Sequence, residues 1–419
     1  MKVGILTFHS SYNFGANLQT LSVQEMLGAR GSCPIVIDYR DPWRTEMYHS
    51  RVSSAQVQVH EQFIAKYLNT SPQFYSNEEV QEYCNDALDV VLVGSDQVFR
   101  LLPKWAPKQL LRLLRTGSAS SSWTQVTDHL PAYWLPWPRQ GNGMPARASI
   151  AASGCGTAFY YLGRSLRRET QRCLCNFDFV SVRDEWTRLM VRWLSGGKVK
   201  PAMCPDPVFG LNSCFHIPPE EPLPIDVSKT ILISAALDGR WLAKFRDLAH
   251  ERGLTISNLP DPHATCAFDE CDFAIPLPLS PLAWYDLLAR AAGYIGVRYH
   301  GLVSSAANRT PAVSLDVSNR PRCLKLKSRS YDLCRKAGAQ ARYVPVNWLA
   351  HPSPDAVMGR LMDESSQARM DFYAEQARSR LTQVFDEIMI RANSSVRARV
   401  SRACTTRVVP SVQTQAQRT

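Results

Sequence analysis

The 419-residue sequence lacks the features of several large protein classes. No run approaches the roughly 20 apolar residues of a membrane-spanning helix, and the start, MKVGILTFHS, lacks the charged, apolar and small-residue regions of a signal peptide. The twelve cysteines show no paired CxxC spacing of a structural zinc site, and the first loop is not the GxGxxG of a dinucleotide site. We therefore expect a cytoplasmic protein with reduced cysteines.

The composition is that of an ordinary globular protein, with 45% hydrophobic and 20% charged residues. A chain of this length favours two domains over a single core. The net charge of +11 depends partly on residues 393–419, where five arginines occur without an acidic residue. Without that tail the net charge is about +6, so the strong basicity is partly a property of the tail.

The first half alternates apolar runs with helical patterns, as expected for a parallel sheet covered by helices. The runs are short and nearly continuous, which is typical of strands buried on both faces. Asp184 stands where a helix N-cap is expected, before EWTRLMVRWL. The predicted strands are Lys2–Phe8, Pro34–Tyr39, Asp89–Gly94, Ala148–Ser153, Phe177–Arg183 and Met203–Phe209, with a helix at Leu18–Ala29.

The second half repeats this pattern after a stretch in which four of the seven residues from Pro218 to Pro224 are proline. Ser280 and Pro281 together form a helix start signal. An amphipathic helix is predicted at Gln367–Ile390. The predicted strands are Thr230–Leu237, Thr255–Leu259, Phe273–Leu277, Tyr294–Val297 and Ala312–Leu315, with a helix at Arg240–Arg252.

These elements predict an α/β fold of GT-B type, with two Rossmann-type domains facing an interdomain cleft and a C-terminal amphipathic helix. We place the N-terminal domain at 1–215, a proline-rich linker at 216–228 and the C-terminal domain at 229–362. The helix follows at 363–392, and a basic, disordered tail at 393–419.

A long excursion is predicted in the first domain at residues 100–147. Its first part has basic residues at near-helical spacing among leucines, although Pro103 and Pro107 argue against one continuous helix. The pieces GSASSSW and YWLPWPRQGNGMP then predict a surface excursion or lid. The basic part is either an ordinary surface helix or a contact with an anionic membrane or a lipid-linked acceptor.

Polar residues gather at the carboxyl ends of the predicted strands. Ligands bind at this edge in open α/β sheets, because the unpaired N–H groups of helix N-termini converge there. The residues concerned are Asp96, Arg183, Arg298 and His300, with His9, Asn13 and Asn17 from the loop HSSYNFGAN.

Six segments, in this order, resemble the polysaccharide pyruvyl transferase family and cover most of residues 1–330. They are GILTFHSSYNFGANLQT, GSDQVF, ASIAASGCG, FVSVRDEW, CPDPVF and RYHGLVSSAANRTPAVSLD. The chain departs from the family pattern at Phe99, where a tryptophan is expected, and in its longer excursion. The resemblance implies transfer of pyruvate from phosphoenolpyruvate to two hydroxyls of a sugar, which forms a cyclic ketal. The acceptor is then an oligosaccharide or a lipid-linked saccharide.

Phosphoenolpyruvate carries a phosphate and a carboxylate, and arginine can bind both anions bidentately. We therefore expect Arg298 and Arg183 to bind the donor, together with Lys325. We expect no metal and no cofactor besides this co-substrate, although a divalent ion at Asp96 or Asp206 stays open.

Ketal formation also needs an acid/base group that titrates near neutral pH, and His300 is the first candidate. Arg298 should lower the pKa of His300 and bound phosphate should raise it, so we hypothesise that donor binding protonates this histidine. Asp96 is the second candidate, either to deprotonate an acceptor hydroxyl or to protonate the methylene carbon. In the first domain, the acceptor side, the orienting residues are His9, Asn13 and Asn17.

Structural roles compete with these assignments. His300 can be a structural hydrogen-bonding residue, Arg183 can pair with Asp184 or Glu185, and Asp96 can cap a helix. Two other functions also stay open: a GT-B glycosyltransferase with a sugar-nucleotide donor, and a non-catalytic protein that binds polyanions. We expect no nucleic-acid partner, because no recognisable nucleic-acid module is present. Peripheral contact with the inner face of a membrane is a further option.

Overall fold

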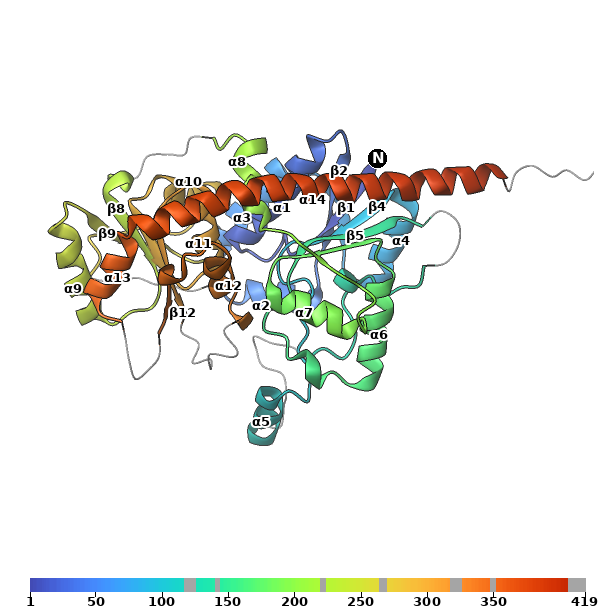
Figure 1. The fold of residues 1–419 in the computed structure, drawn as a ribbon, viewed down its shortest axis with the longest axis horizontal. Helices are drawn as coiled ribbons and strands as arrows, with labels where there is room; N and C mark the ends of the chain where they lie inside the picture. Colours follow the sequence, from blue (N-terminus) through green and yellow to red (C-terminus); the bar gives the residue numbers. More distant parts are fainter. Residues whose placement is uncertain are drawn as a thin grey trace, which may run out of the picture.

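The computed structural model describes residues 1–116, 126–139, 144–218, 224–263, 270–316, 326–346 and 352–405. In these residues the chain forms two parallel β-sheets with helices packed against them, and a long helix that lies along both halves (Figure 1). The expected α/β architecture is confirmed. None of the described helices combines the length and the apolar character of a membrane span.

The first sheet lies within residues 2–203. Its strands are β1 (Lys2–Leu6), β2 (Cys33–Tyr39), β3 (Thr70–Phe74), β4 (Val90–Val93), β5 (Ala146–Ala152), β6 (Phe179–Val182) and β7 (Ala202–Met203). Its helices are α1 (Phe14–Gly28), α2 (Pro42–His49), α3 (Ser54–Tyr67), α4 (Asn77–Ala87), α5 (Pro107–Thr116), α6 (Arg164–Cys175), α7 (Glu185–Leu194) and α8 (Leu211–Cys214). The strand order is β3-β2-β1-β4-β5-β6-β7.

The second sheet lies within residues 230–345. Its strands are β8 (Thr230–Ser234), β9 (Thr255–Asn258), β10 (Phe273–Ala274), β11 (Gly293–Gly296), β12 (Ala312–Asp316) and β13 (Tyr343–Pro345). The helices of this half are α9 (Gly239–His250), α10 (Pro281–Arg290), α11 (Tyr299–Ala307), α12 (Arg329–Lys336), α13 (Pro354–Leu361) and α14 (Glu364–Thr405). The strand order is β10-β9-β8-β11-β12-β13.

Local sequence signals explain the starts of several elements. The strands β4 and β11 are buried along their whole length, as their continuous apolar sequences predict. The Asp184 side chain accepts a hydrogen bond from Thr187 N at 2.8 Å, and Ser280 accepts one from Ala283 N at 2.9 Å. Both predicted N-caps are therefore confirmed, and each satisfies a backbone N–H that the helix leaves unpaired.

The helix α14 packs across both halves and extends further than predicted. Met370, Ala377 and Leu381 are buried on its predicted apolar face, and Figure 1 shows it lying along both sheets. It continues to Thr405, so residues 393–405 are helical and the expected disordered tail is wrong for them. The arginine- and alanine-containing sequence of this stretch has no glycine or proline to end a helix. Residues 406–419 lie outside the described part.

The predicted surface excursion is also partly wrong. The 3₁₀ turn η1 (Ala132–Trp134) lies in the core, where the Trp134 ring packs at 4.7 Å from Phe99 and the Tyr133 ring at 4.7 Å from Phe8. Aromatic side chains bury large areas, so this segment adds to the core instead of covering it from outside. The piece GSASSSW lies outside the described residues.

Glycine at position 94 shapes the turn after β4. Gly94 has φ +118°, and a Cβ there would lie 2.2 Å from the backbone oxygen of Ile150. Only glycine fits this approach, which lets the chain turn directly from the strand to Asp96. The backbone oxygen of Asp96 then accepts a hydrogen bond from Ser153 N at 2.8 Å. This turn therefore fixes the place of a candidate site residue.

Candidate active site

A cavity of about 860 Å³ lies between the carboxyl edges of the two sheets. The first domain contributes the end of β1, the start of α1 and the turn after β4, and the second contributes the start of α11 and of α12. The interdomain cleft expected from the sequence is therefore present. Residues that line it include Phe8, Ser11, Asn13, Gly15, Asp96, Gln97, Arg100, Asp261, His263, Trp284, Arg298, Tyr299, His300 and Arg329.

His300 lies on the cavity wall in the first turn of α11. It is 9% exposed, and its Nε2 atom has no hydrogen-bond partner in the described part of the chain. Arg298 occupies the N-cap position of the helix without a side-chain capping bond. An uncapped helix N-terminus beside an unpaired imidazole nitrogen is suited to an anion or a polar ligand.

The environment of His300 favours its neutral form. Burial lowers its pKa to about 4, with the carboxylates of Asp96 and Asp206 opposing this shift and the arginines Arg183 and Arg329 supporting it. The arginine predicted to lower this pKa was Arg298, whereas the main cause is burial. At neutral pH the imidazole is therefore uncharged in this environment.

The first turn of α1 packs directly against His300. A Cβ at Gly15 would lie 2.0 Å from Cγ of His300, so only glycine permits this approach between the two domains. The NFGAN and RYHG segments are thus in contact, although Gly15 and His300 are 285 positions apart in the sequence. The glycine helps to set where the imidazole sits in the cavity.

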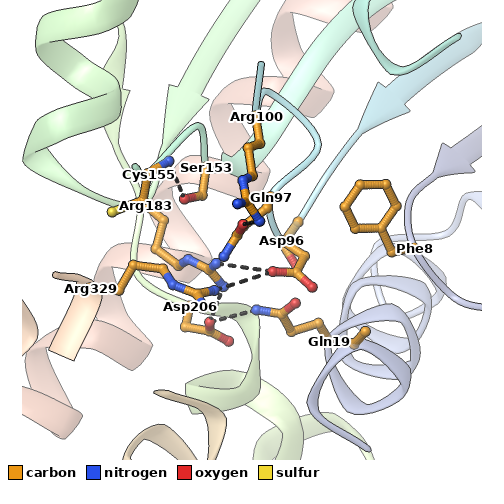
Figure 2. A network of polar contacts seen from close by, with 12 residues as sticks. Phe8, Gln19, Asp96, Gln97, Arg100, Ser153, Cys155, Arg183, Asp206 and Arg329 are labelled. Atoms are coloured by element: carbon orange, nitrogen blue, oxygen red, sulfur yellow. Dashed lines mark hydrogen bonds and ion pairs between the residues drawn. The ribbon is translucent and has the colours of Figure 1, made fainter. Parts of the chain in front are cut away.

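The buried Arg183 forms ion pairs with two carboxylates near His300, those of Asp96 and Asp206. Arg183 donates to Asp206 Oδ2 at 2.6 Å and to Asp96 Oδ1 at 3.3 Å, and Gln19 Nε2 donates to the same Asp206 oxygen at 2.5 Å (Figure 2). Burial alone would raise the pKa of Asp96, but His300, Arg183 and Arg329 lower it below its usual value. Asp96 is therefore ionised at neutral pH. The partners of Arg183 in this network are not Asp184 or Glu185, the alternatives considered from the sequence.

Two arginines of the second domain reach the cavity itself. Arg329 Nη1 lies 3.4 Å from Asp96 Oδ1, and its guanidinium carbon is 4.9 Å from the centre of the Tyr299 ring. Arg298 Nε lies 2.7 Å from Asp261 Oδ2. The sequence did not identify Arg329, because no motif marks it and it reaches Asp96 only through the docking of α12 on the first domain. Lys325 lies outside the described residues.

The three candidates from the HSSYNFGAN loop take different places. Asn13 lines the cavity and caps α1 by accepting from Ala16 N at 3.2 Å. His9 is buried behind the wall, with Nε2 at 2.9 Å from Asp38 Oδ1, and Asn17 donates to the His9 backbone oxygen at 2.8 Å. His9 and Asn17 support the loop, whereas Asn13 faces the space that a ligand would fill.

The first-domain side of the cavity is richer in aromatic and acidic residues. Tyr39, Tyr75, Glu78 and Asp128 line it, and none of them was singled out from the sequence because they follow separate elements without a shared motif. Within the described residues, no group of three or more His, Cys, Asp or Glu side chains is arranged to hold a metal ion.

Comparison with known proteins gives a family match and distant structural neighbours. The model of the polysaccharide pyruvyl transferase family matches residues 13–319. No curated protein sequence matches the chain. A structure described as a UDP-N-acetylglucosamine 2-epimerase from Listeria monocytogenes aligns with a TM-score of 0.50 and 9% identity, over 92% of this chain and 97% of that chain.

Two glycosyltransferase structures align less closely. The spinosyn forosaminyltransferase SpnP aligns with a TM-score of 0.47 and 14% identity, over 94% of this chain and 99% of that chain. The E. coli heptosyltransferase WaaC with ADP aligns with a TM-score of 0.40 and 11% identity, over 87% of this chain and 100% of that chain. At such low identity these likenesses concern the fold alone, which is GT-B-like.

The Gly15 contact predicts a clear difference between two glycines of α1. Gly15→Ala should destabilise the protein by about 1 to 3 kcal/mol, because the new methyl group overlaps the His300 ring. Gly28→Ala is the matched control, since a Cβ there meets nothing within 4 Å, and alanine should stabilise the helix by up to about 1 kcal/mol. Urea denaturation of both variants measures this. Equal stability of the two variants would show that the contact is absent.

The low pKa of His300 predicts how stability changes with pH. In the unfolded chain its pKa is near 6.5, so below that pH the unfolded state takes up a proton that the folded state, with a pKa of about 4, does not. Stability should therefore fall as the pH drops from 6.5 to 4, with about 3 kcal/mol attributable to His300.

Urea denaturation at several pH values compares the wild type with His300→Gln. The variant should not show the part of the stability loss between pH 6.5 and 4 that comes from His300. His250→Gln is the control, because His250 is an exposed histidine paired with Asp272 on the second domain. If His300→Gln and the wild type lose stability in parallel, His300 is not a buried neutral group.

Proposed function

Because the chain belongs to the polysaccharide pyruvyl transferase family, we propose that it transfers pyruvate from phosphoenolpyruvate to two hydroxyls of a sugar, as a cyclic ketal. Family membership makes the protein a transferase with a polysaccharide-related acceptor. The observation that best supports the specific donor is His300, which lines the cavity beside two arginines and has a buried Nε2 atom without a hydrogen-bond partner in the described part of the chain.

The cationic side of the cavity suits the donor. Phosphoenolpyruvate needs a site for a phosphate and another for a carboxylate, and Arg298 and Arg329 provide two guanidinium groups on the same wall. The N–H groups at the start of α11 add a third attraction for an anion. Arg183, which the sequence also assigned to the donor, is better suited to stabilise Asp96 from behind because it is buried and paired.

The reaction adds a proton to the methylene carbon, which makes C2 electrophilic. One sugar hydroxyl attacks C2, the bond from C2 to the phosphate oxygen breaks, and the second hydroxyl then attacks C2 and closes the ketal. The two hydroxyls lose one proton each. One proton is balanced by the new methyl group, and the other leaves with the released phosphate.

His300 and Asp96 are the proposed acid/base groups for these proton transfers. The imidazole is neutral before binding, and a bound dianionic phosphate raises its pKa, so it takes up a proton that assists phosphate binding and departure. Asp96 is ionised, so of the two roles expected for it, accepting a hydroxyl proton is the better supported.

The acceptor would lie against the first domain. Aromatic rings such as Tyr39 and Tyr75 can pack against the apolar faces of a sugar, and Asn13, Glu78 and Asp128 can accept hydrogen bonds from its hydroxyls. Acidic side chains on this side also favour a neutral sugar over an anionic one at that position.

A donor screen tests the proposed function. The protein is incubated with phosphoenolpyruvate and a panel of neutral oligosaccharides, and phosphate release and the mass gain of a pyruvyl ketal are measured. His300→Gln should lower kcat by about 100- to 10,000-fold, as expected for loss of an acid/base group, whereas His250→Gln should keep wild-type turnover. Release of nucleoside diphosphate from a sugar nucleotide, with no ketal from any acceptor, would instead support the glycosyltransferase.

A further inference from the structure

The helix α5 projects from the body of the first domain (Figure 1). Two leucines on it, Leu111 and Leu114, are 52% and 76% exposed, and Trp105 just before it is 57% exposed. Exposed apolar residues that cluster on one short element commonly mark an interaction surface. This helix therefore has an apolar face without a covering element in the described part of the chain.

The loop that holds α5 begins and ends at the cavity. Thr127 N donates to Leu102 O at 3.0 Å, and Leu102 N donates to Thr127 Oγ1 at 2.9 Å, so two hydrogen bonds close its base. Arg100, Leu102 and Thr127 all line the cavity. A surface that binds α5 would therefore lie close to the rim of the candidate active site.

The charge of this segment favours one kind of partner. From Arg100 to Thr116 the sequence has five basic residues and no acidic residue. Leucines at positions 110, 111 and 114 alternate in the sequence with these basic residues. Exposed leucines within a basic segment are the chemistry of a helix that lies on an anionic lipid surface, and tryptophan favours the same interface.

A second copy of the chain fits this surface less well. A two-fold dimer would place the same patch against itself, and it would therefore bring two sets of five basic residues together. Such like-charge contacts oppose association, whereas acidic phospholipids neutralise them.

We propose that the segment Arg100–Thr116 binds the surface of an anionic lipid bilayer. With ten residues, α5 is shorter than the roughly 20 residues that cross a membrane, so it lies in the interface. The position of its loop at the cavity rim then orients the site toward the membrane. This last step rests on the proposed function, because it makes a lipid-linked saccharide the natural acceptor, while lipid binding itself does not depend on that function.

Sedimentation of the full-length protein with vesicles tests this proposal. Binding to phosphatidylcholine vesicles containing phosphatidylglycerol should be at least ten-fold stronger than to phosphatidylcholine alone, and it should weaken with salt. The variant Leu111→Ser/Leu114→Ser should lose at least ten-fold in binding, and Arg112→Gln about five-fold. The control is Phe372→Ser/Ile390→Ser, which removes side chains that are 61% and 66% exposed on α14 and should leave binding unchanged.

Absence of binding to anionic vesicles, or equal binding by the leucine variant, would overturn the proposal. So would a dimer in sedimentation velocity without lipid that only the leucine variant dissociates, since the surface would then bind a second copy. Pyruvyl transfer to a soluble oligosaccharide should be unchanged in the leucine variant. If the wild type lacks that transfer but still binds anionic vesicles, the proposed function is wrong and the proposed lipid binding by Arg100–Thr116 is supported.

Discussion

The buried guanidinium of Arg183 connects the parts of the first domain that form the site. It pairs with Asp96 after β4 and with Asp206 before the 3₁₀ turn η3 (Pro207–Gly210), and Gln19 of α1 donates to the same Asp206 oxygen. Removing one partner from such a buried network typically costs about 3 to 5 kcal/mol, because a charge is left uncompensated. The position of Asp96, which also pairs with Arg329 of the second domain at 3.4 Å, therefore depends on this cation.

This arrangement leaves an electrostatic asymmetry in the cavity. The carboxylates near its floor are already neutralised by arginines, while His300 is buried, uncharged and unpaired at Nε2. An incoming dianion would meet a helix N-terminus and two guanidinium groups, and it would favour the protonated imidazole, which burial disfavours. In the proposed reaction the site would therefore gain a proton together with its anionic ligand, and this proton would assist the departure of phosphate. The aromatic and acidic lining of the first-domain side is the part that we propose for a neutral sugar.

Local signals made much of this predictable. Continuous apolar runs located the central strands, Asp184 and Ser280 marked helix starts, and the RYHG segment placed Arg298 and His300 at a strand end facing the cleft. Arg329 could not be found in this way, because its role depends on how α12 packs on the other domain. Tyr133 and Trp134 lie among prolines that indicate a loop, yet Phe8 and Phe99 offer rings that bury them. The positions of these side chains depend on contacts between segments that are far apart in the sequence, which local patterns do not reveal.

The central claim is that donor binding protonates His300. Calorimetry of phosphoenolpyruvate binding at neutral pH, in buffers of different ionisation enthalpy, measures the number of protons taken up. Subtracting the value for His300→Gln, which keeps Arg298 and Arg329, removes the protons that come from the ligand and from other groups. If donor binding protonates His300, the wild type takes up more protons than the variant, by up to one per site. Equal uptake by both proteins, with binding intact, would contradict it.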